Sequence, residues 1–157
     1  MKKQIFSIAM GLFMTALTTA TFASSTNATS NPKLTAKEKA VKNFTNQFEN
    51  VSDPSVILKK EGMILQSEAD DHAISSAYDK KGNWLYTIKL YPAENLAGNI
   101  VKIITDHYNN YYITKMEKVD QPGKATVFVV HMQNDDSFKT LRVVNRDVEL
   151  IQDFKKG

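Results

Sequence analysis

The 157-residue sequence contains no cysteine, and glycine and proline are scarce, with 6 and 4 residues. Without cysteine the chain can form no disulfide, no thiolate metal site and no lipoprotein anchor. The scattered glycines form no phosphate-binding loop. The three histidines, His72, His107 and His131, contain no pair at metal-ligand spacing on a helix or hairpin. We therefore predict no bound metal and no cofactor.

Local catalytic signatures are also missing. Residues 70–72 (DDH) and 134–136 (NDD) have the composition of polar turns, and the second lacks the distal glutamate of a calcium loop. Ser75 and Ser76 lie within an expected strand, without the glycine-flanked turn that exposes a nucleophile. The sequence therefore predicts that the chain is not an enzyme. Acid–base pairs assembled in space leave no local signature, so a cryptic enzyme stays open as an alternative.

The chain begins with the three regions of a secretory signal. Residues 1–3 (MKK) are basic, residues 5–20 are apolar apart from Ser, Thr and Gly, and residues 21–23 (TFA) are suited to cleavage after Ala23. The apolar run is short for a bilayer span, so we expect a signal peptide at 1–23 and no membrane anchor. Residues 24–33 are rich in Ser, Asn and Thr, which predicts a flexible tether. The predicted location is periplasmic or secreted.

The net charge of the chain argues against a nucleic-acid partner. Removing Lys2 and Lys3 with the leader leaves 18 basic and 17 acidic residues, a net charge of +1. That balance provides no electrostatic footprint for a polyanion, so we expect no nucleic-acid partner. The remaining 134 residues suit one compact domain at 34–157, with halves at about 34–91 and 92–157.

Two segments have the apolar spacing of helices. In residues 34–50 the apolar side chains recur three and four positions apart, and Thr35 can cap the first turn. Pro54 ends this segment. Residues 92–108 repeat the spacing, with Pro92 at the start and Gly98 as a weak point. Each apolar stripe is as wide as one buried face, which predicts helices packed on a sheet.

Elsewhere the period changes to two, which is typical of strands. The residues between the segments have turn compositions, notably 79–82 (DKKG) and 121–124 (QPGK). Short connections without crossovers predict antiparallel pairing. The predicted fold class is therefore α+β, with tandem helix-plus-four-strand repeats and an antiparallel sheet that carries both helices on one face. The expected strands are 56–58, 63–65, 72–78, 84–91, 111–119, 125–132, 138–144 and 148–154.

Several of these segments carry a resemblance. Residues 78–89 (YDKKGNWLYTIK) and 111–114 (YYIT), with 129–132 (VVHM) and 138–143 (FKTLRV), resemble the small exported PepSY-like proteins of Bacteroidetes. That family is described as similar in fold to the β-lactamase inhibitor protein, a doubled helix-plus-four-strand structure. The resemblance spans residues 39–154 and implies a fold and an exported location, but no activity. Two departures are the missing glycine at 145–147 and Val56 at a commonly aromatic position.

The expected strands hold most of the aromatic side chains, and an antiparallel sheet tolerates one uncovered face. In residues 138–144, Leu141 and Val143 alternate with Phe138 and Arg142, which predicts a core side and an interface side. His131 and Tyr86 can share the interface side if the register allows it. The predicted binding surface comprises Tyr86, His131, Phe138 and Arg142.

Three functions remain compatible with the sequence. The first is a non-catalytic exported module that binds a protein or peptide of the cell envelope through the open sheet face, with inhibition as one form of that role. The second is a small-ligand-binding protein or cryptic enzyme with a pocket between sheet and helices. The third is an envelope structural or stress protein. Fold alone does not decide between them.

Overall fold

The computed structural model describes residues 34–96 and 98–157. The predicted signal peptide at 1–23 and tether at 24–33 lie outside the described residues. The elements follow the order helix, four strands, a short 3-10 helix with a second α-helix, and four more strands. This order agrees with the prediction from the sequence.

Helix α1 (Ala36–Gln47) begins with a capping box, and Thr35 is its N-cap residue, as predicted from the sequence. The Glu38 backbone N–H donates to Thr35 Oγ1 at 3.2 Å, and the Thr35 N–H donates to Glu38 Oε2 at 2.8 Å. The helix is three residues shorter at its end than predicted, because Phe48 is already extended. Asn50 then adopts a left-handed conformation with φ of 58°.

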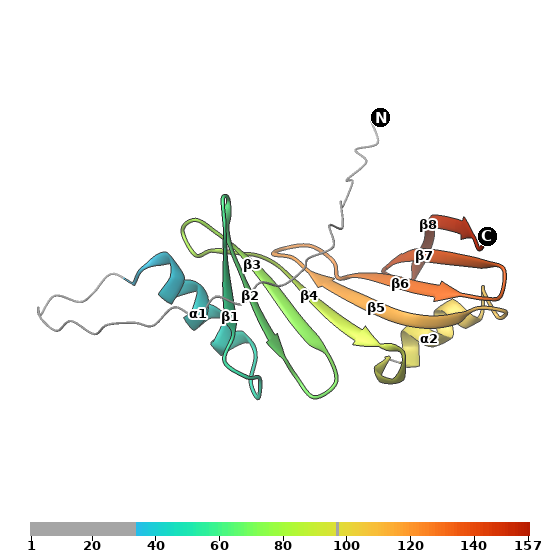
Figure 1. The fold of residues 1–157 in the computed structure, drawn as a ribbon, viewed down its shortest axis with the longest axis horizontal. Coiled ribbons are helices and arrows are strands. Elements are labelled where there is room, and N and C mark those ends of the chain that lie inside the picture. The colour runs from blue at the N-terminus through green and yellow to red at the C-terminus, as the bar shows by residue number, and fades with distance from the viewer. Residues whose placement is uncertain (1–33, 97) are drawn as a thin grey trace, which may run out of the picture. The chain divides into compact units, whose positions relative to one another are not determined.

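Eight antiparallel strands form one sheet in sequence order (Figure 1), which confirms the predicted pairing. Every neighbouring pair is sequential, so each strand is joined to the next by a hairpin or, between the fourth and fifth strands, by the helical segment. The strands are β1 (Ser55–Lys59), β2 (Gly62–Glu68), β3 (Ala73–Asp79), β4 (Trp84–Pro92), β5 (Tyr112–Asp120), β6 (Val127–Gln133), β7 (Ser137–Val144) and β8 (Asp147–Lys155).

The second helical segment differs from its prediction. Strand β4 continues through Pro92, a short 3-10 helix η1 (Ala93–Asn95) follows, and α2 spans only Gly98–Thr105. Leu96 has ψ of 140°, an extended value that separates the two helical pieces. Gly98, the weak point of the sequence pattern, is therefore the first residue of α2 rather than an interior position.

Both helices pack on the same face of the sheet. Leu65 of β2 pairs with Ser76 of β3, which in turn pairs with Thr87 of β4, so these three side chains lie on one side of the sheet. Tyr91, four residues further along β4, lies on the same side and pairs with Met116 of β5. Leu65 belongs to the buried cluster under α1, and Met116 belongs to the cluster under α2. This confirms that the helices share one face, which we call the helix face.

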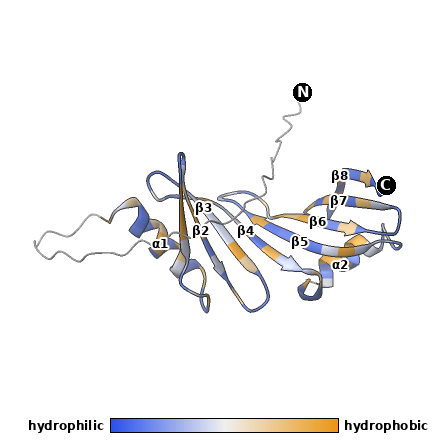
Figure 2. Ribbon diagram, viewed as in Figure 1, coloured by the Kyte–Doolittle hydropathy of each residue, from blue (hydrophilic) through white to orange (hydrophobic). Residues whose placement is uncertain are grey.

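The two clusters have different helical partners. Under α1 the core contains Phe44 and Phe48 with strand residues of β2 and β3, and under α2 it contains Ile100 and Ile104 with residues of β5, β6 and β7. In Figure 2, α1 shows hydrophilic blue between its apolar positions, whereas α2 shows more orange. A helix as short as α2 depends on this packing, because so few residues form no stable helix alone.

We expect Phe48→Ala to lower the free energy of unfolding by about 3–5 kcal/mol, because Phe48 is 8% exposed and its ring centroid lies 4.8 Å from that of Phe44. Phe154→Ala is the matched control, because Phe154 is 58% exposed and should cost about 1 kcal/mol or less. Urea unfolding measures both values. Equal losses in the two variants would contradict the packing of α1 on the sheet.

The turn between β7 and β8 stores backbone strain. Asn145 and Arg146 both have positive φ, at 51° and 74°, which is the pattern of a type I′ hairpin turn. Asparagine tolerates this region, whereas arginine is destabilised there by about 1–2 kcal/mol. Residues 145–147 contain no glycine, although the positive φ values of this turn favour glycine.

Arg146→Gly should raise the free energy of unfolding by about 0.5–1 kcal/mol, since the relief of strain exceeds the added chain entropy of glycine. Lys124→Gly is the control, because Lys124 is not among the residues with positive φ and gains nothing from glycine. Thermal melts of both variants check the sign. A lower melting temperature for Arg146→Gly would contradict the assigned strain.

Candidate binding face

The face opposite α1 and α2 is exposed on β7, as the alternation in its sequence predicted. Leu141 and Val143 point to the helix face and are 0% and 1% exposed. Phe138, which points the other way, is 47% exposed, and Arg142 is also exposed. We call this side the helix-free face; its central residues are Tyr86, Ile88 and Leu90 on β4, Lys115, Glu117 and Val119 on β5, Val127, Val129 and His131 on β6, and Phe138, Thr140 and Arg142 on β7.

The structure brings three of the four predicted surface residues together. His131 pairs with Thr140, which lies between Phe138 and Arg142 on the same side of β7. Tyr86 lies on the same face but at a distance. Its neighbour Thr87 pairs with Asp120, whereas His131 pairs with Lys115, five residues away along β5. Tyr86 lies one residue beyond Thr87, so the offset between Tyr86 and His131 is six residues, about 20 Å along the strands.

Phe138 and Arg142 have partners from β8. Phe138 is directly opposite Phe154, and Lys156 Nζ lies 4.8 Å from the centroid of the Phe138 ring. Arg142 Nη1 donates to Glu149 Oε2 at 3.3 Å, in an ion pair whose side chains are about half exposed. Such an exposed pair stabilises the fold by about 1 kcal/mol or less, so Arg142 can exchange this partner at little cost.

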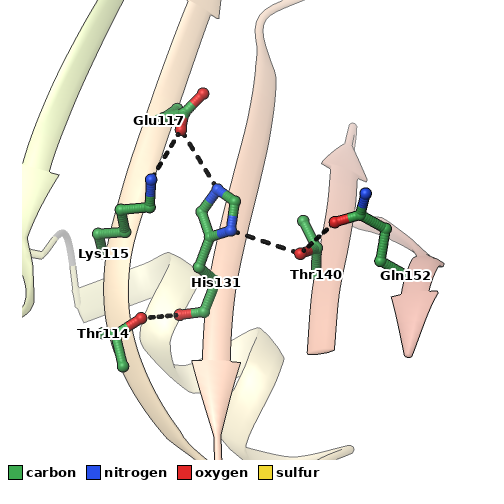
Figure 3. A network of polar contacts seen from close by, with 6 residues as sticks. All are labelled: Thr114, Lys115, Glu117, His131, Thr140 and Gln152. Atoms are coloured by element: carbon green, nitrogen blue, oxygen red, sulfur yellow. Dashed lines mark hydrogen bonds and ion pairs between the residues drawn. The ribbon is translucent and has the colours of Figure 1, made fainter. Parts of the chain in front are cut away.

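A polar network crosses four strands at the centre of this face (Figure 3). Glu117 Oε1 lies 3.2 Å from His131 Nε2 and 3.4 Å from Lys115 Nζ. His131 Nδ1 lies 3.4 Å from Thr140 Oγ1, which donates to Gln152 Oε1 at 3.0 Å. Each strand from β5 to β8 thus supplies at least one member. Glu117 and Thr140 are both 7% exposed, although neither helix covers them.

The hydrogen-bond direction at Thr140 follows the orientation of the Gln152 amide. With Gln152 Oε1 toward Thr140, the Thr140 hydroxyl donates to it and faces His131 Nδ1 as an acceptor. A half-turn of the amide would reverse the Thr140 hydroxyl, which would then donate to His131 Nδ1. In both arrangements Glu117 Oε1 lies 3.2 Å from His131 Nε2.

Glu117 is the electrostatic centre of the network. Its hydrogen bond to His131 lowers the pKa of the carboxyl below its ordinary value, against the opposing effect of burial, and the charges of His131 and Lys115 add to the lowering. The carboxylate is therefore ionised at neutral pH and holds the two cationic or donor groups beside it. Sequence analysis missed Glu117 and Thr140, because both are significant only once the register places them beside His131.

The order Glu117–His131–Thr140 is that of an acid–base–nucleophile triad, yet the geometry does not support that chemistry. The distance from Thr140 Oγ1 to His131 Nδ1 is 3.4 Å, longer than the hydrogen bond between a nucleophile and its base. Thr140 is also nearly buried within strand β7, not on an exposed turn. In residues 34–96 and 98–157, no group of three or more His, Cys, Asp or Glu side chains could hold a metal ion.

A second feature is an open hollow of about 500 Å³ at the end of the sheet where β2 joins β3. Asp70, Asp71 and Glu94 line it together with Lys115. Asp71 Oδ1 lies 2.5 Å from His72 Nδ1, a hydrogen bond that lowers the pKa of the Asp71 carboxyl. His72 stacks on Tyr91 with ring centroids 4.7 Å apart. The small-ligand alternative expected a pocket between the sheet and the helices, whereas the residues that line this hollow come from strand ends, the β2–β3 turn and η1.

Glu117→Gln should lower the free energy of unfolding at pH 7 by about 1–3 kcal/mol, because His131 and Lys115 lose their anionic partner. The folded-state pKa of Glu117 is lowered, so its contribution is complete above the unfolded value near 4.5 and is lost as pH falls through the folded value. The difference between wild type and Glu117→Gln should therefore shrink below pH 4.5.

Glu149→Gln is the matched control for Glu117→Gln, because Glu149 is exposed and its pairing with Arg142 contributes about 1 kcal/mol or less. Urea denaturation between pH 3 and pH 7 measures both differences. A difference for Glu117→Gln that stays constant across this range would contradict the role of the ionised carboxylate.

Comparison with known proteins identifies the fold of the chain but does not assign the chain to a family. No family model and no curated protein matches the chain at a significant level. Among residues 34–96 and 98–157, no helix has the length and apolar character needed to cross a bilayer.

Solved structures from Bacteroides share the architecture. A DUF2874 family protein from Bacteroides ovatus superposes with a TM-score of 0.58 at 11% identity, covering 82% of this chain and 89% of its own. A BLIP-like protein from Bacteroides fragilis has a TM-score of 0.55 at 18% identity, with 76% and 87% covered. A Bacteroides eggerthii protein, provisionally described as periplasmic, has a TM-score of 0.58 at 4% identity, with 75% and 87% covered. The chain therefore has a BLIP-like α+β fold.

Proposed function

We propose that the chain is a non-catalytic exported binding module that holds a protein or peptide on the helix-free face of its sheet. The observation that carries this proposal is the arrangement of β7, where Phe138 and Arg142 are exposed beside a nearly buried polar network. The BLIP-like fold supports a binding or inhibitory role by analogy. Inhibition of an exported enzyme is the specific form of this role that we favour.

The composition of the surface supports a protein partner. Aromatic residues and arginine are enriched in protein interfaces, and they supply most of the residues whose truncation weakens binding. Phe138 and Phe154 offer adjacent apolar rings, and Arg142 offers a guanidinium whose present partner is only an exposed carboxylate. A partner that presents an apolar side chain and a carboxylate or carbonyl oxygen would satisfy both features.

The polar network gives this surface a rigid base. Hydrogen bonds from Glu117 through His131 to Thr140 and Gln152 tie β5, β6, β7 and β8 together in the direction perpendicular to the strands. A surface fixed before binding loses less conformational entropy when a partner docks. The network therefore acts as support for the binding residues, with His131 both a member of it and part of the surface.

The proposal also includes the cellular location of the protein and the evolutionary origin of its two halves. The leader sequence at 1–23 and the periplasmic description of one structural neighbour support a periplasmic or secreted location. The sequence resemblance supports a PepSY-like relationship. The repeated element order, with a separate buried cluster under each helix, supports an origin of the two halves by duplication of one helix-plus-four-strand unit.

The open hollow favours a second candidate function, the binding of a small ligand. Its volume of about 500 Å³ lies within the range of ligand sites, and its carboxylates would select a cationic group. Its open shape makes it the weaker candidate, because ligand sites usually enclose most of the ligand surface.

The test of the proposed face compares Phe138→Ala and Arg142→Ala with wild type in quantitative pull-downs from the envelope fraction. Each truncation should weaken capture of a specific partner by about 1 kcal/mol or more, roughly fivefold, and leave the melting temperature nearly unchanged. Arg146→Gly is the control, since it also removes one exposed arginine charge but lies in the hairpin tip. Variants that melt normally and retain every partner would remove the proposed surface.

A further inference from the structure

One end of the first half of the sheet brings together three segments that are distant in sequence. The β1–β2 turn and the β3–β4 turn lie side by side there, because Gly62 pairs with Asp79 (Figure 1). The start of α1 joins them: Lys39 Nζ donates to Asn83 Oδ1 at 2.6 Å. A Cβ atom at Gly82 would lie only 2.3 Å from the carbonyl oxygen of Ala36, which shows how closely the helix start and the turn approach.

These three segments carry a local excess of positive charge. All the basic residues are exposed lysines: Lys37 and Lys39 of α1, Lys59 and Lys60 of the first turn, and Lys80 and Lys81 of the second. The acidic residues are three: Glu61, whose Oε2 lies 3.9 Å from Lys80 Nζ, and two that are engaged with the backbone. Glu38 belongs to the capping box, and Asp79 accepts from the N–H groups of Lys81 and Asn83 at 2.8 Å each.

Three exposed leucines lie among the lysines. Leu58 precedes Lys59 and is 71% exposed, the highest value among the exposed large hydrophobic side chains. Leu34 precedes the cap of α1 and is 49% exposed, and Leu85 follows the second turn and is 45% exposed. We call the six lysines and three leucines together the lysine–leucine end.

We propose that the lysine–leucine end is a peripheral binding site for the surface of an anionic phospholipid bilayer. Its lysines would lie against lipid phosphates and its leucines would enter the interfacial region. Each clustered lysine near an anionic membrane raises the partition coefficient by roughly fivefold, and exposed apolar side chains add to this.

The composition favours a lipid surface over an acidic protein. Protein interfaces are enriched in arginine and aromatic residues and depleted in lysine. The three segments that form the lysine–leucine end, residues 34–39, 58–62 and 79–85, contain no arginine and no exposed aromatic ring. Lysine acts as a mobile point charge, which suits a fluid array of phosphates better than one fixed partner geometry.

The opposite ends of the same hairpins would face away from the membrane. The β2–β3 turn, which lies at the far end of these strands, carries Asp70 and Asp71. The turn between β6 and β7 at that end carries Asp135 and Asp136. An anionic surface would attract one end of the sheet and repel the other, so the binding would be oriented. It would also leave the helix-free face of β6, β7 and β8 accessible.

The test is vesicle flotation of the full chain with large unilamellar vesicles. One set contains 30 mol% phosphatidylglycerol in phosphatidylethanolamine, and the other contains phosphatidylcholine alone. The informative variant is Lys80→Gln with Lys81→Gln. Its matched control is Lys155→Gln with Lys156→Gln, a lysine pair with the same charge change, formed by the last residue of β8 and the residue after it. Any contribution of the leader is common to every variant.

Loss of Lys80 and Lys81 should lower the partition coefficient on anionic vesicles by roughly tenfold or more, and the control pair should change it by less than about twofold. Binding should weaken between 50 mM and 500 mM salt, because screening acts on exposed charges. Leu58→Ser should also reduce binding by roughly tenfold, whereas Leu150→Ser on β8 should not. The emission of Trp84, the single tryptophan, and circular dichroism verify folding in each variant.

If the double variant is misfolded, Lys60→Gln provides the same test in the neighbouring turn. Equal binding to anionic and neutral vesicles, or equal losses for the two lysine pairs, would overturn the proposal. Binding to soluble polyglutamate without binding to vesicles would overturn it in favour of an acidic protein partner. None of these outcomes depends on the helix-free face, so the two surfaces are tested separately.

Discussion

The continuous register of the eight strands is the constraint on which the rest of the structure depends. Successive side chains of a strand point to opposite faces, so one register fixes the direction of every residue in the sheet. Here the register places Leu65, Met116 and Leu141 under the helices. It places Glu117, His131 and Arg142 on the other side. A slip of one residue in any strand would exchange these sets and expose the core of that strand.

Burial on the helix-free face follows a different principle from burial under the helices. Under α1 and α2 the side chains are apolar and removal from water stabilises them directly. Glu117 and Thr140 are buried to a similar extent without a helix above them. A buried carboxylate is tolerated only when it is paired, and Lys115 and His131 provide that pairing. The network is therefore better suited to holding strands in place than to general stabilisation.

The chain also separates its charges along the strands. The near-zero net charge of the sequence hides an excess of lysine at the tips of the β1–β2 and β3–β4 hairpins and of aspartate at the opposite tips. Because antiparallel strands alternate in direction, turns that alternate along the sequence gather at the same end of the sheet. A composition that excluded a polyanion partner for the whole molecule is thus compatible with a local cationic surface. Net charge describes the average field, whereas binding responds to the local one.

The sequence by itself determined the α+β class, the eight antiparallel strands, the helix start at Thr35 and the core side of β7, because hydrophobic periodicity and turn residues act locally. It placed the start of the second helix wrongly at Pro92, where pairing of β4 with β5 prevailed over local preference. Only the tertiary structure decided that His131 joins Glu117, Thr140 and Gln152, and that Tyr86 lies about 20 Å away along the strands. Contacts across strands depend on register, and no local pattern in the sequence specifies it.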